Sequence, residues 1–385
     1  MKFIHTSDWH IGRQFHNVSL LDDQRHVLEQ IVAHIKTEAV DAVIIAGDIY
    51  DRSVPPAAAV SLLDEVLNKI CTELGVPVIL IPGNHDGAER LRFGSKQLSQ
   101  AGLHIIGDLN QITQPVILTK KDCTVSFYGI PYNDPESVRH HFSADVSSHD
   151  EAHEFLVAQI NAVKAPNSLN VLISHCFIDG AEASESERPL SIGGADRVSV
   201  EPFKAFDYVA LGHLHNPQHK GEAHIRYSGS ILKYSFSEQR QQKGVTLVEM
   251  NPSGLQAITH LPLTPLRDMR TLEGDLETLL QQGATDPHKQ DYVLIRLTDQ
   301  RALLEPMSKL RQVYENVLHI EKTWLQDSGT LQVNRDKLKR GELEMFEDFF
   351  KQVSGNELTA DQQLAIQQII TNTVNSQEGG LAWNL

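Results

Sequence analysis

Short apolar runs alternate with longer segments of helical periodicity along the first 250 residues of the chain. Apolar runs between turn-forming residues predict strands, and apolar residues recurring every three or four positions predict helices. The expected strands are residues 2–5, 42–46, 78–81, 103–106, 115–118, 124–130, 170–174, 208–211, 226–230 and 244–250. The expected helices are residues 22–38, 56–74, 88–101 and 152–163, and residues 13–20 and 181–198 are expected to be loops. This alternation predicts a layered α/β domain.

The pattern changes after residue 260. Two prolines within residues 261–266 suggest a linker, and the following segment predicts strand 269–272, helix 276–282, strand 292–297, helix 303–313 and strand 317–322. Two more helices are expected at residues 342–353 and 359–374, and Thr359 with Gln362 has the spacing of a capping box. We therefore expect a main domain at 1–265, a small α+β domain at 266–335 and a helix pair at 336–385.

Side chains of the kinds that bind metals follow five of the expected strands. They are Asp8 and His10, Asp48, Asn84, His175, and His213 with His215. Any one of them, taken alone, could be a polar turn residue or a histidine of the core. Ligands bind beyond the carboxyl ends of the strands in open α/β sheets, so five such occurrences favour one shared site.

The residue types in this set define its chemistry. Imidazole, carboxylate and amide ligands without thiolate suit Mn²⁺, Fe²⁺ or Zn²⁺. The three cysteines are far apart and form no CxxC pair, which indicates a reducing compartment and no thiolate site. Seven ligands are too many for one ordinary site and suit two, provided that one carboxylate bridges them. Such a metal pair is a common device for hydrolysing phosphate esters.

Charge and hydropathy limit the class of partner. The net charge of −16 is unusual for a nucleic-acid binder, so DNA binding would need local basic loops, divalent cations or a partner protein. No leader pattern and no apolar run of about 18 residues is present in the sequence, so we expect a cytoplasmic protein without a membrane span.

The five motifs together resemble the calcineurin-like metallophosphoesterase family. The sequences on which this resemblance rests are HTSDWHIG, AGDIYDRSVPP, PGNHD, ALGHLHNPQ and YSGSILKYSFSE, together with the single His175 after its strand. Within the family the chain is most similar to the bacterial double-strand-break nuclease subunits. The resemblance implies a layered β-sandwich metallophosphoesterase fold flanked by helices, with a small α+β cap domain that binds DNA and a C-terminal helix pair. It also implies two divalent ions, Mn²⁺ in the first place, with Mg²⁺, Fe²⁺ or Zn²⁺ as alternatives.

The resemblance assigns roles to individual residues. One ion would be held by Asp8, His10, Asp48 and His215, and the other by the bridging Asp48 with Asn84, His175 and His213. His85 would face the scissile phosphate and stabilise the transition state or protonate the leaving oxygen, and Asp51 would orient His85. Asp86 is expected to be structural, and His5 is expected to be a core or supporting residue rather than a ligand.

The implied activity is that of a DNA nuclease, an exonuclease on duplex ends and an endonuclease on hairpins and single strands, in DNA repair, recombination and replication. The subfamily works as a homodimer with a coiled-coil ATPase in a heterotetramer, which would use helices 56–74 and 88–101 as a dimer face and the terminal helices as the ATPase contact. For the two helices, ordinary packing on the sheet is the alternative. Four arginines near the site loops, Arg13, Arg52, Arg90 and Arg92, could contact DNA or simply be solvated.

Two other functions remain open at this point. A phosphodiesterase for small substrates would use the same metals but has no evident need of a cap domain and terminal helices. A non-catalytic scaffold on this fold would be expected to lose ligands, and here every one is present.

Overall fold

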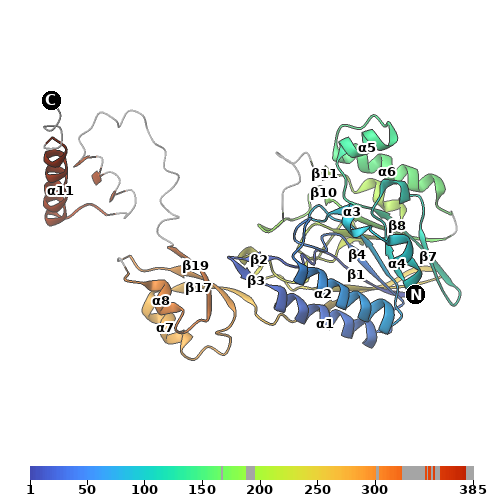
Figure 1. The fold of residues 1–385 in the computed structure, drawn as a ribbon, viewed down its shortest axis with the longest axis horizontal. Coiled ribbons are helices and arrows are strands. Elements are labelled where there is room, and N and C mark those ends of the chain that lie inside the picture. Colours follow the sequence, from blue (N-terminus) through green and yellow to red (C-terminus); the bar gives the residue numbers. More distant parts are fainter. Residues whose placement is uncertain are drawn as a thin grey trace. The chain divides into compact units, whose positions relative to one another are not determined.

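The computed structural model describes residues 1–165, 168–187, 196–300, 303–322, 343–344, 346–347, 350–351 and 356–378. The chain divides into two compact units, Met1–Met269 and Arg270–Leu385 (Figure 1). No helix within the described ranges is both long and apolar enough to cross a membrane.

Two six-stranded sheets form the first unit. The first sheet has the order β16 (Gly254–Pro262), β15 (Gly244–Asn251), β1 (Lys2–Thr6), β4 (Ala42–Ala46), β5 (Val78–Ile81) and β6 (Leu103–Ile105). The second has the order β13 (Gln218–Lys220), β14 (Glu222–Tyr227), β12 (Tyr208–Gly212), β9 (Leu169–His175), β8 (Cys123–Ile130) and β7 (Val116–Lys120). Strands β1, β4, β5 and β6 are parallel, as are β8, β9, β12 and β14, so many carboxyl ends share one edge.

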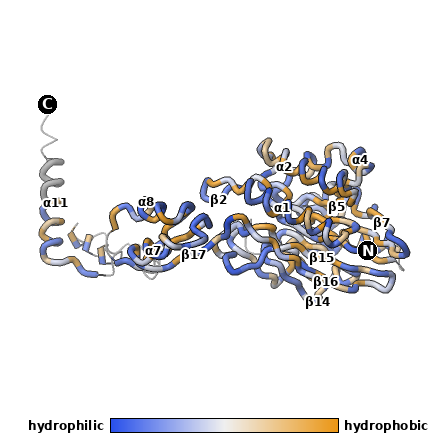
Figure 2. Tube along the Cα trace, turned by 90° about the horizontal axis from the view of Figure 1, so that it is seen from below, coloured by the Kyte–Doolittle hydropathy of each residue, from blue (hydrophilic) through white to orange (hydrophobic). Residues whose placement is uncertain are grey.

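The core lies between the sheets. Phe3, Ile44 and Ile81 of the first sheet meet Phe127 and Tyr208 of the second, and the ring centroid of Phe3 is 5.5 Å from that of Phe127. All five residues of β4 are buried, so the outer face of this strand is covered as well. Helices α1 (Leu21–Thr37) and α2 (Ala57–Leu67) lie side by side along this sheet (Figure 1). Figure 2 shows hydrophilic and hydrophobic positions alternating along both helices, as amphipathic packing requires.

The second sheet is covered on its outer face by α6 (His149–Val163) and α5 (Pro135–Phe142). Leu156 and Ile160 of α6 and Val138 of α5 pack in one cluster with Leu172 and Val209. Short 3-10 turns complete this unit at Ser99–Ala101, Leu109–Gln111, Glu201–Ala205 and Phe236–Glu238. The predicted layered β-sandwich flanked by helices is therefore confirmed.

Two predicted elements of the site-bearing face were wrong. The helix expected at 88–101 is broken into α3 (Ala88–Leu91), α4 (Ser95–Leu98) and a 3-10 turn, because Gly94 adopts a left-handed φ of 72°. The loop expected at 13–20 contains a small hairpin of β2 (Gln14–Phe15) and β3 (Val18–Ser19). The helix expected at 56–74 is continuous, with α2 extended by a π-helical turn, Asn68–Glu73.

Other differences concern strand ends and loops. Helix α5 lies where the sequence pattern predicted no helix, and Asp134 accepts a hydrogen bond from the Ser137 N–H as its N-cap. The expected linker at 261–266 begins inside β16, which pairs with β15 along its whole length. The strand expected at 226–230 ends at Tyr227. The expected loop at 181–198 ends in β11 (Arg197–Val198), which pairs with β10 (Phe177–Ile178).

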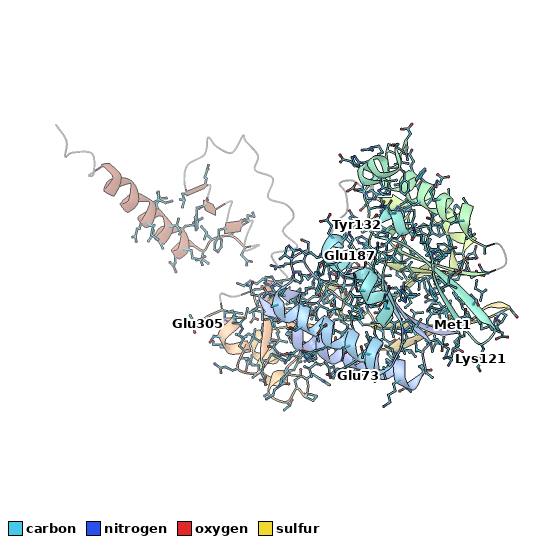
Figure 3. All side chains as sticks on the ribbon, turned by 45° about the vertical axis from the view of Figure 1, so that its right-hand side comes forward. Met1, Glu73, Lys121, Tyr132, Glu187 and Glu305 are labelled. Carbon is cyan, nitrogen blue, oxygen red and sulfur yellow. The ribbon has the colours of Figure 1, made fainter. Side chains whose placement is uncertain are left out.

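The second unit begins with a three-stranded sheet in the order β17 (Met269–Gly274), β18 (Tyr292–Leu297) and β19 (Asn316–Lys322). Its helices are α7 (Leu276–Gly283) and α8 (Pro306–Leu310), and Glu305, with a left-handed φ of 46°, precedes α8 (Figure 3). Leu279, Ile295 and Tyr314 belong to its separate core. The predicted small α+β fold is confirmed, although the second helix is shorter than the expected 303–313.

The terminal segment contains α11 (Ala360–Glu378). The predicted capping box is confirmed, because the Gln362 N–H donates to Thr359 Oγ1 and Gln362 Oε1 accepts from the Thr359 N–H. The first expected terminal helix, 342–353, lies largely outside the described residues, although Phe346 and Phe350 there stack with centroids 6.5 Å apart.

Candidate metal centre

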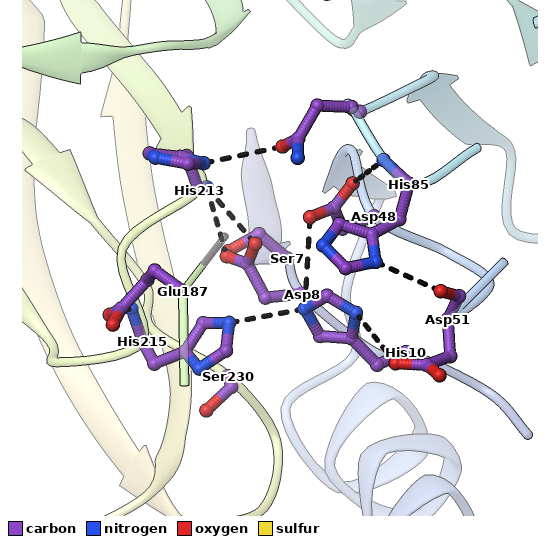
Figure 4. A network of polar contacts seen from close by, with 12 residues as sticks. Ser7, Asp8, His10, Asp48, Asp51, His85, Glu187, His213, His215 and Ser230 are labelled. Atoms are coloured by element: carbon purple, nitrogen blue, oxygen red, sulfur yellow. Dashed lines mark hydrogen bonds and ion pairs between the residues drawn. The ribbon is translucent and has the colours of Figure 1, made fainter. Parts of the chain in front are cut away.

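The polar residues predicted after five strands converge at the carboxyl edges of the two sheets. Asp8 and His10 follow β1, Asp48 follows β4 and Asn84 follows β5; His175 ends β9, and His213 and His215 follow β12. In Figure 4 the side chains of Asp8, His10, Asp48, His213 and His215 point toward one another. The structure thus brings together all seven predicted ligands.

The first group of ligand atoms comprises Asp8, His10 and His215, whose ligand atoms lie within 4.8 Å of one another. His10 Nε2 is 3.1 Å from His215 Nε2. Two imidazole nitrogens at this distance face a common point, where a divalent ion would accept a lone pair from each.

The second group comprises Asn84, His175 and His213. Asn84 Oδ1 is 3.0 Å from His175 Nε2 and 3.3 Å from His213 Nδ1. Asp48 Oδ2 lies between the groups, 3.5 Å from His175 Nε2 and 3.7 Å from His10 Nε2. The other oxygen, Asp48 Oδ1, accepts the His85 N–H at 2.8 Å. The Asp48 carboxylate therefore has the position that a shared ligand needs.

Burial and mutual charge set the protonation of these groups. Of the seven predicted ligands, His213 is 3% exposed, and all the others except Asn84 are at most 2% exposed. Burial lowers the pKa of His10 and of His213 well below 6.5, which keeps these imidazoles neutral, as ligands must be. Burial raises the pKa of Asp8 to about 6.

Asp48 and His175 behave as a charged pair when no ion is bound. Burial opposes the ionised form of each, but their mutual attraction raises the pKa of His175 to about 9 and holds the pKa of Asp48 well below its usual range. An ion bound at His175 Nε2 would displace the proton there.

Hydrogen bonds outside the ligand groups fix their orientation. His175 Nδ1–H donates to Ala46 O at 2.8 Å, and the His213 N–H donates to Asp8 Oδ1 at 3.0 Å. Gln24 of α1 donates from Nε2 to His10 O at 2.7 Å, and its Oε1 accepts the Gly12 N–H. The segment that carries Asp8 and His10 is thereby tied to the first helix.

Two glycines stand directly before ligand residues, Gly83 before Asn84 and Gly212 before His213, and the backbone of neighbouring strands packs closely against both. A Cβ on Gly83 would lie 2.2 Å from Asp48 Oδ1, and one on Gly212 would lie 1.9 Å from Ala46 O. No side chain fits at either position, so the strand ends can meet only because these residues are glycines.

The predicted partnership of His85 and Asp51 takes a different form. His85 Nδ1–H donates to the backbone carbonyl of Asp51 at 2.9 Å. The Asp51 carboxylate instead lies 3.2 Å from Arg13 Nη1 and 3.7 Å from His10 Nδ1. The hydrogen bond that holds His85 thus comes from the Asp51 backbone, while the Asp51 carboxylate stays close to both rings, with one ligand atom each of His10, Asp51 and His85 within 4.8 Å of one another.

Two neighbouring residues have the supporting contacts expected of them. The Asp86 carboxylate accepts the N–H groups of Ile49, Tyr50 and Gly83, which joins the loops after β4 and β5. His5 lies in the core, with Nδ1 2.9 Å from Tyr208 Oη and Nε2 3.1 Å from Leu211 O.

Several residues at the site were not found from the sequence. Ser186, Glu187, Glu238 and Lys243 surround His215 with hydrogen bonds and an ion pair. Glu238 lies inside one of the quoted motifs, but no spacing or periodicity marks Ser186 or Glu187. Of the four arginines named above, Arg13 contacts Asp51 and Ser186 O, and Arg92 pairs with Asp108.

Comparison with known proteins identifies the class. The calcineurin-like phosphoesterase family matches residues 1–217, and the type 5 capsule protein repressor C-terminal domain (SbcD_C) matches residues 265–354. The fold and the ligand cluster thus define a calcineurin-like phosphoesterase.

Full-length relatives narrow the assignment. The chain is 36% identical over 372 residues to the SbcD subunit of the SbcCD nuclease of Staphylococcus epidermidis, covering 96% of this chain and 98% of that protein. It is 36% identical over 375 residues to the protein of the same name from Staphylococcus saprophyticus, with the same coverage. The chain belongs to this SbcD family of nuclease subunits. Among solved structures, a dimetal phosphatase from Danio rerio has 13% identity and a TM-score of 0.40, covering 69% of this chain and 99% of that one.

Family membership confirms the predicted class of activity. The chain is a metallophosphoesterase of the nuclease type, a hydrolase of phosphodiester bonds, and the family implies divalent metal ions. The imidazole, carboxylate and amide donors described above fit such ions.

Proposed function

We propose that the chain is a Mn²⁺-dependent DNA nuclease that cleaves duplex ends, hairpins and single strands at a two-ion site. Asp8, His10, Asp48 and His215 would hold one ion, and Asp48, Asn84, His175 and His213 the other. The observation that carries this proposal is the position of Asp48 Oδ2 between His10 Nε2 and His175 Nε2. A bound pair would offset charge on the phosphoryl oxygens of the substrate.

The protein's own groups would complete the reaction. With Nδ1–H held by the carbonyl of Asp51, the free ring nitrogen of His85 is Nε2. In its cationic form His85 would face the scissile phosphate and give the Nε2 proton to the leaving oxygen. Asp51 would act through its backbone, and its carboxylate would act on the His10 side of the site.

The substrate and partner are proposed from the charge and the family together. A chain of net charge −16 needs help to approach DNA, and the relatives carry the name of a two-component complex, SbcCD. We assign the partner, an SbcC-type coiled-coil ATPase, to the terminal segment 336–385, and DNA to the cap domain 266–335 together with the nuclease domain 1–265. On α11, Leu364 and Ile369 are 66% and 59% exposed, which leaves apolar surface for such a partner.

A homodimer, and with it a heterotetramer, is proposed through the α2 face. Val60 of α2 and Leu98 of α4 line one hollow and are 45% and 38% exposed, and Val54 before α2 and Phe93 between α3 and α4 are 62% and 86% exposed. Exposed large apolar groups gathered on one side of a domain are typical of an interface. We place the complex in the cytoplasm with bacterial DNA.

One assay separates this proposal from the alternative of a small-substrate phosphodiesterase. The purified chain would be incubated with Mn²⁺ and either end-labelled duplex, hairpin and single-stranded DNA or a soluble chromogenic phosphodiester. The proposal predicts cleavage of DNA substrates, strengthened on duplex ends by the ATPase partner and ATP. Turnover of the chromogenic diester alone, with every DNA substrate intact even with the partner present, would favour the alternative.

A further inference from the structure

The loop at 182–187 reaches the metal centre through Ser186 and Glu187. Ser186 Oγ lies 2.5 Å from His215 Nδ1 and also 2.5 Å from Glu238 Oε1. Ser186 is 9% exposed and Glu238 is fully buried. Glu187, the next residue of the loop, accepts the backbone N–H of His215 at 2.7 Å. The same short loop thus holds both the backbone and the ring of one predicted ligand.

A buried lysine fixes the charge of Glu238. Lys243 Nζ is 2.6 Å from Glu238 Oε2, and it also donates to His215 O and Ser230 Oγ at 2.7 and 2.8 Å. Beside this ammonium group Glu238 is a carboxylate, and a carboxylate can only accept hydrogen bonds. Ser186 Oγ also lies 3.0 Å from Ser184 Oγ, but the carboxylate at 2.5 Å is the nearer acceptor and carries the charge, so the single Ser186 hydroxyl proton goes to Glu238 Oε1.

The direction of that hydrogen bond determines the tautomer of His215. Because Ser186 Oγ has given its proton to Glu238, it can only accept from His215, so the ring proton stands on Nδ1. His215 Nε2 is then left with its lone pair, directed toward His10 Nε2 at 3.1 Å. The hydrogen bonds from His215 Nδ1–H to the Ser186 hydroxyl, and from that hydroxyl to the Glu238 carboxylate, also raise the basicity of His215 Nε2 and make it a better metal ligand.

The other ligand histidines do not depend on this loop. His175 has its Nδ1–H fixed by the backbone carbonyl of Ala46 within the sandwich. His10 Nδ1 has no hydrogen-bond partner among the described residues. The hydrogen-bonded chain through Ser186 and Glu238 therefore acts on His215 and not on His10 or His175.

We propose that Ser186 and Glu238 are positioning residues that hold the His215 proton on Nδ1 and aim Nε2 at the ion shared with Asp8 and His10. The inference deepens the proposed function and rests on it for the identity of the ion, but the tautomer itself is a property of the metal-free chain. It predicts an unequal effect: losing the hydroxyl weakens the ion on the His215 side and spares the ion held by Asn84, His175 and His213.

The test compares Ser186→Ala with Ser253→Ala. Ser253 is an exposed serine in the turn between β15 and β16, and it touches neither His215 nor the loop at 182–187, so it is the control for the substitution itself. Titration calorimetry with Mn²⁺ should show one of two sites weakened about 10–100-fold in Ser186→Ala and both sites unchanged in Ser253→Ala. Nitrogen-15 NMR of the histidine rings in metal-free protein should show Nδ1–H for His215 in wild type and Ser253→Ala, and a tautomer mixture in Ser186→Ala.

A second variant guards against a simple folding defect. Glu238→Gln with Lys243→Met removes both buried charges together. The Gln amide can donate a hydrogen bond to Ser186 Oγ, and the Ser186 hydroxyl is then free to donate its proton to His215 Nδ1. This pair should move the His215 proton off Nδ1 while circular dichroism remains that of the wild type. The proposal is overturned if Ser186→Ala keeps Nδ1–H on His215, keeps wild-type affinity at both sites, or weakens both sites equally. A wild-type chain that binds fewer than two ions would refute the proposed two-ion function, while the NMR readout would still decide the role of Ser186.

Discussion

Four residues of the ligand cluster hold backbone conformations that side chains rarely adopt. Asp8, His10 and Asp48 have φ values of 52°, 46° and 50°, and His213 has 102°. Each such conformation costs about 1–3 kcal/mol and persists only where surrounding contacts enforce it. Here the Asp8 N–H donates to Gly47 O at 3.0 Å and the His10 N–H to Asp48 O at 2.9 Å. The strain lies in the residues that are aimed at the proposed ions.

His85 provides the first prediction at this scale. In His85→Gln, DNA cleavage should fall about 10²–10⁴-fold, because a proton donor at the leaving oxygen is lost, while both ions remain bound. Product analysis on gels and metal analysis of the same samples measure the two effects. The exposed His140 on α5 is the control, and His140→Gln should match wild type. Loss of an ion in His85→Gln would assign His85 to the ligands instead.

His5 predicts a dependence of stability on pH. Burial lowers the pKa of His5 to about 3, against 6.5 when the chain is unfolded. Because the folded pKa is depressed, the stabilising effect is complete above pH 6.5 and is lost as the pH falls from 6.5 toward 3. Between pH 6.5 and 5.0 the unfolding free energy should fall by roughly 2 kcal/mol from this group.

Urea unfolding with a chelator present would measure this effect. His5→Gln has no imidazole to titrate, so it should lose roughly 2 kcal/mol less than wild type over that interval. Equal losses in the two proteins would show that His5 is not the neutral core group described above.

At the scale of elements, the site exists because parallel strands from two sheets end close together. Gly83→Ala tests that closeness, since its Cβ would stand 2.2 Å from Asp48 Oδ1. We expect it to lower Mn²⁺ affinity at both sites and to destabilise the fold by more than 1 kcal/mol, roughly the scale of overpacking in a core. Calorimetric Mn²⁺ titration and urea unfolding would report both effects.

Gly75→Ala is the control for that substitution. Gly75 has a left-handed φ of 65°, but its Cβ would meet nothing within 4 Å. It should lower stability through backbone strain and leave metal affinity unchanged. Unaltered metal binding in Gly83→Ala would mean that the strand ends have more room than the structure describes.

Elements with strong periodicity could be predicted from the sequence, and elements fixed by tertiary contacts could not. The strand β4 is apolar throughout, so both its existence and the position of Asp48 after it followed directly. The β2–β3 hairpin has only two residues in each strand, and β16 is an edge strand with mixed burial, so neither carries a clear pattern. Ser186 comes to the site through a fold-dependent contact with His215, which local sequence does not encode.

At the scale of the whole molecule, the terminal segment carries the proposed link to the ATPase. A chain that ends at residue 339 should keep Mn²⁺-dependent cleavage of single-stranded DNA, because every proposed ligand lies within Met1–Met269. It should lose co-purification with the ATPase and ATP-stimulated cleavage of duplex ends, since burying one apolar anchor is worth about 1.5–3 kcal/mol.

Point variants test which positions of α11 make the proposed contact with the ATPase. Leu364→Asp with Ile369→Asp places charge on the exposed apolar positions of α11 and should weaken partner binding without shortening the chain. Gln368→Asp adds charge at an exposed polar position of the same helix and serves as the control, with binding expected to stay close to that of wild type. Full ATPase binding by the shortened chain would move the partner surface elsewhere.

The central claim is that one carboxylate, Asp48, serves two ions, and Mn²⁺ titration of Asp48→Ala tests it most directly. Wild type should bind two ions, and His215→Ala should lose high affinity for one of them. Asp48→Ala should lose high affinity for both, because its Oδ2 stands between His10 and His175. An Asp48→Ala protein that binds either ion with wild-type affinity would contradict the shared site.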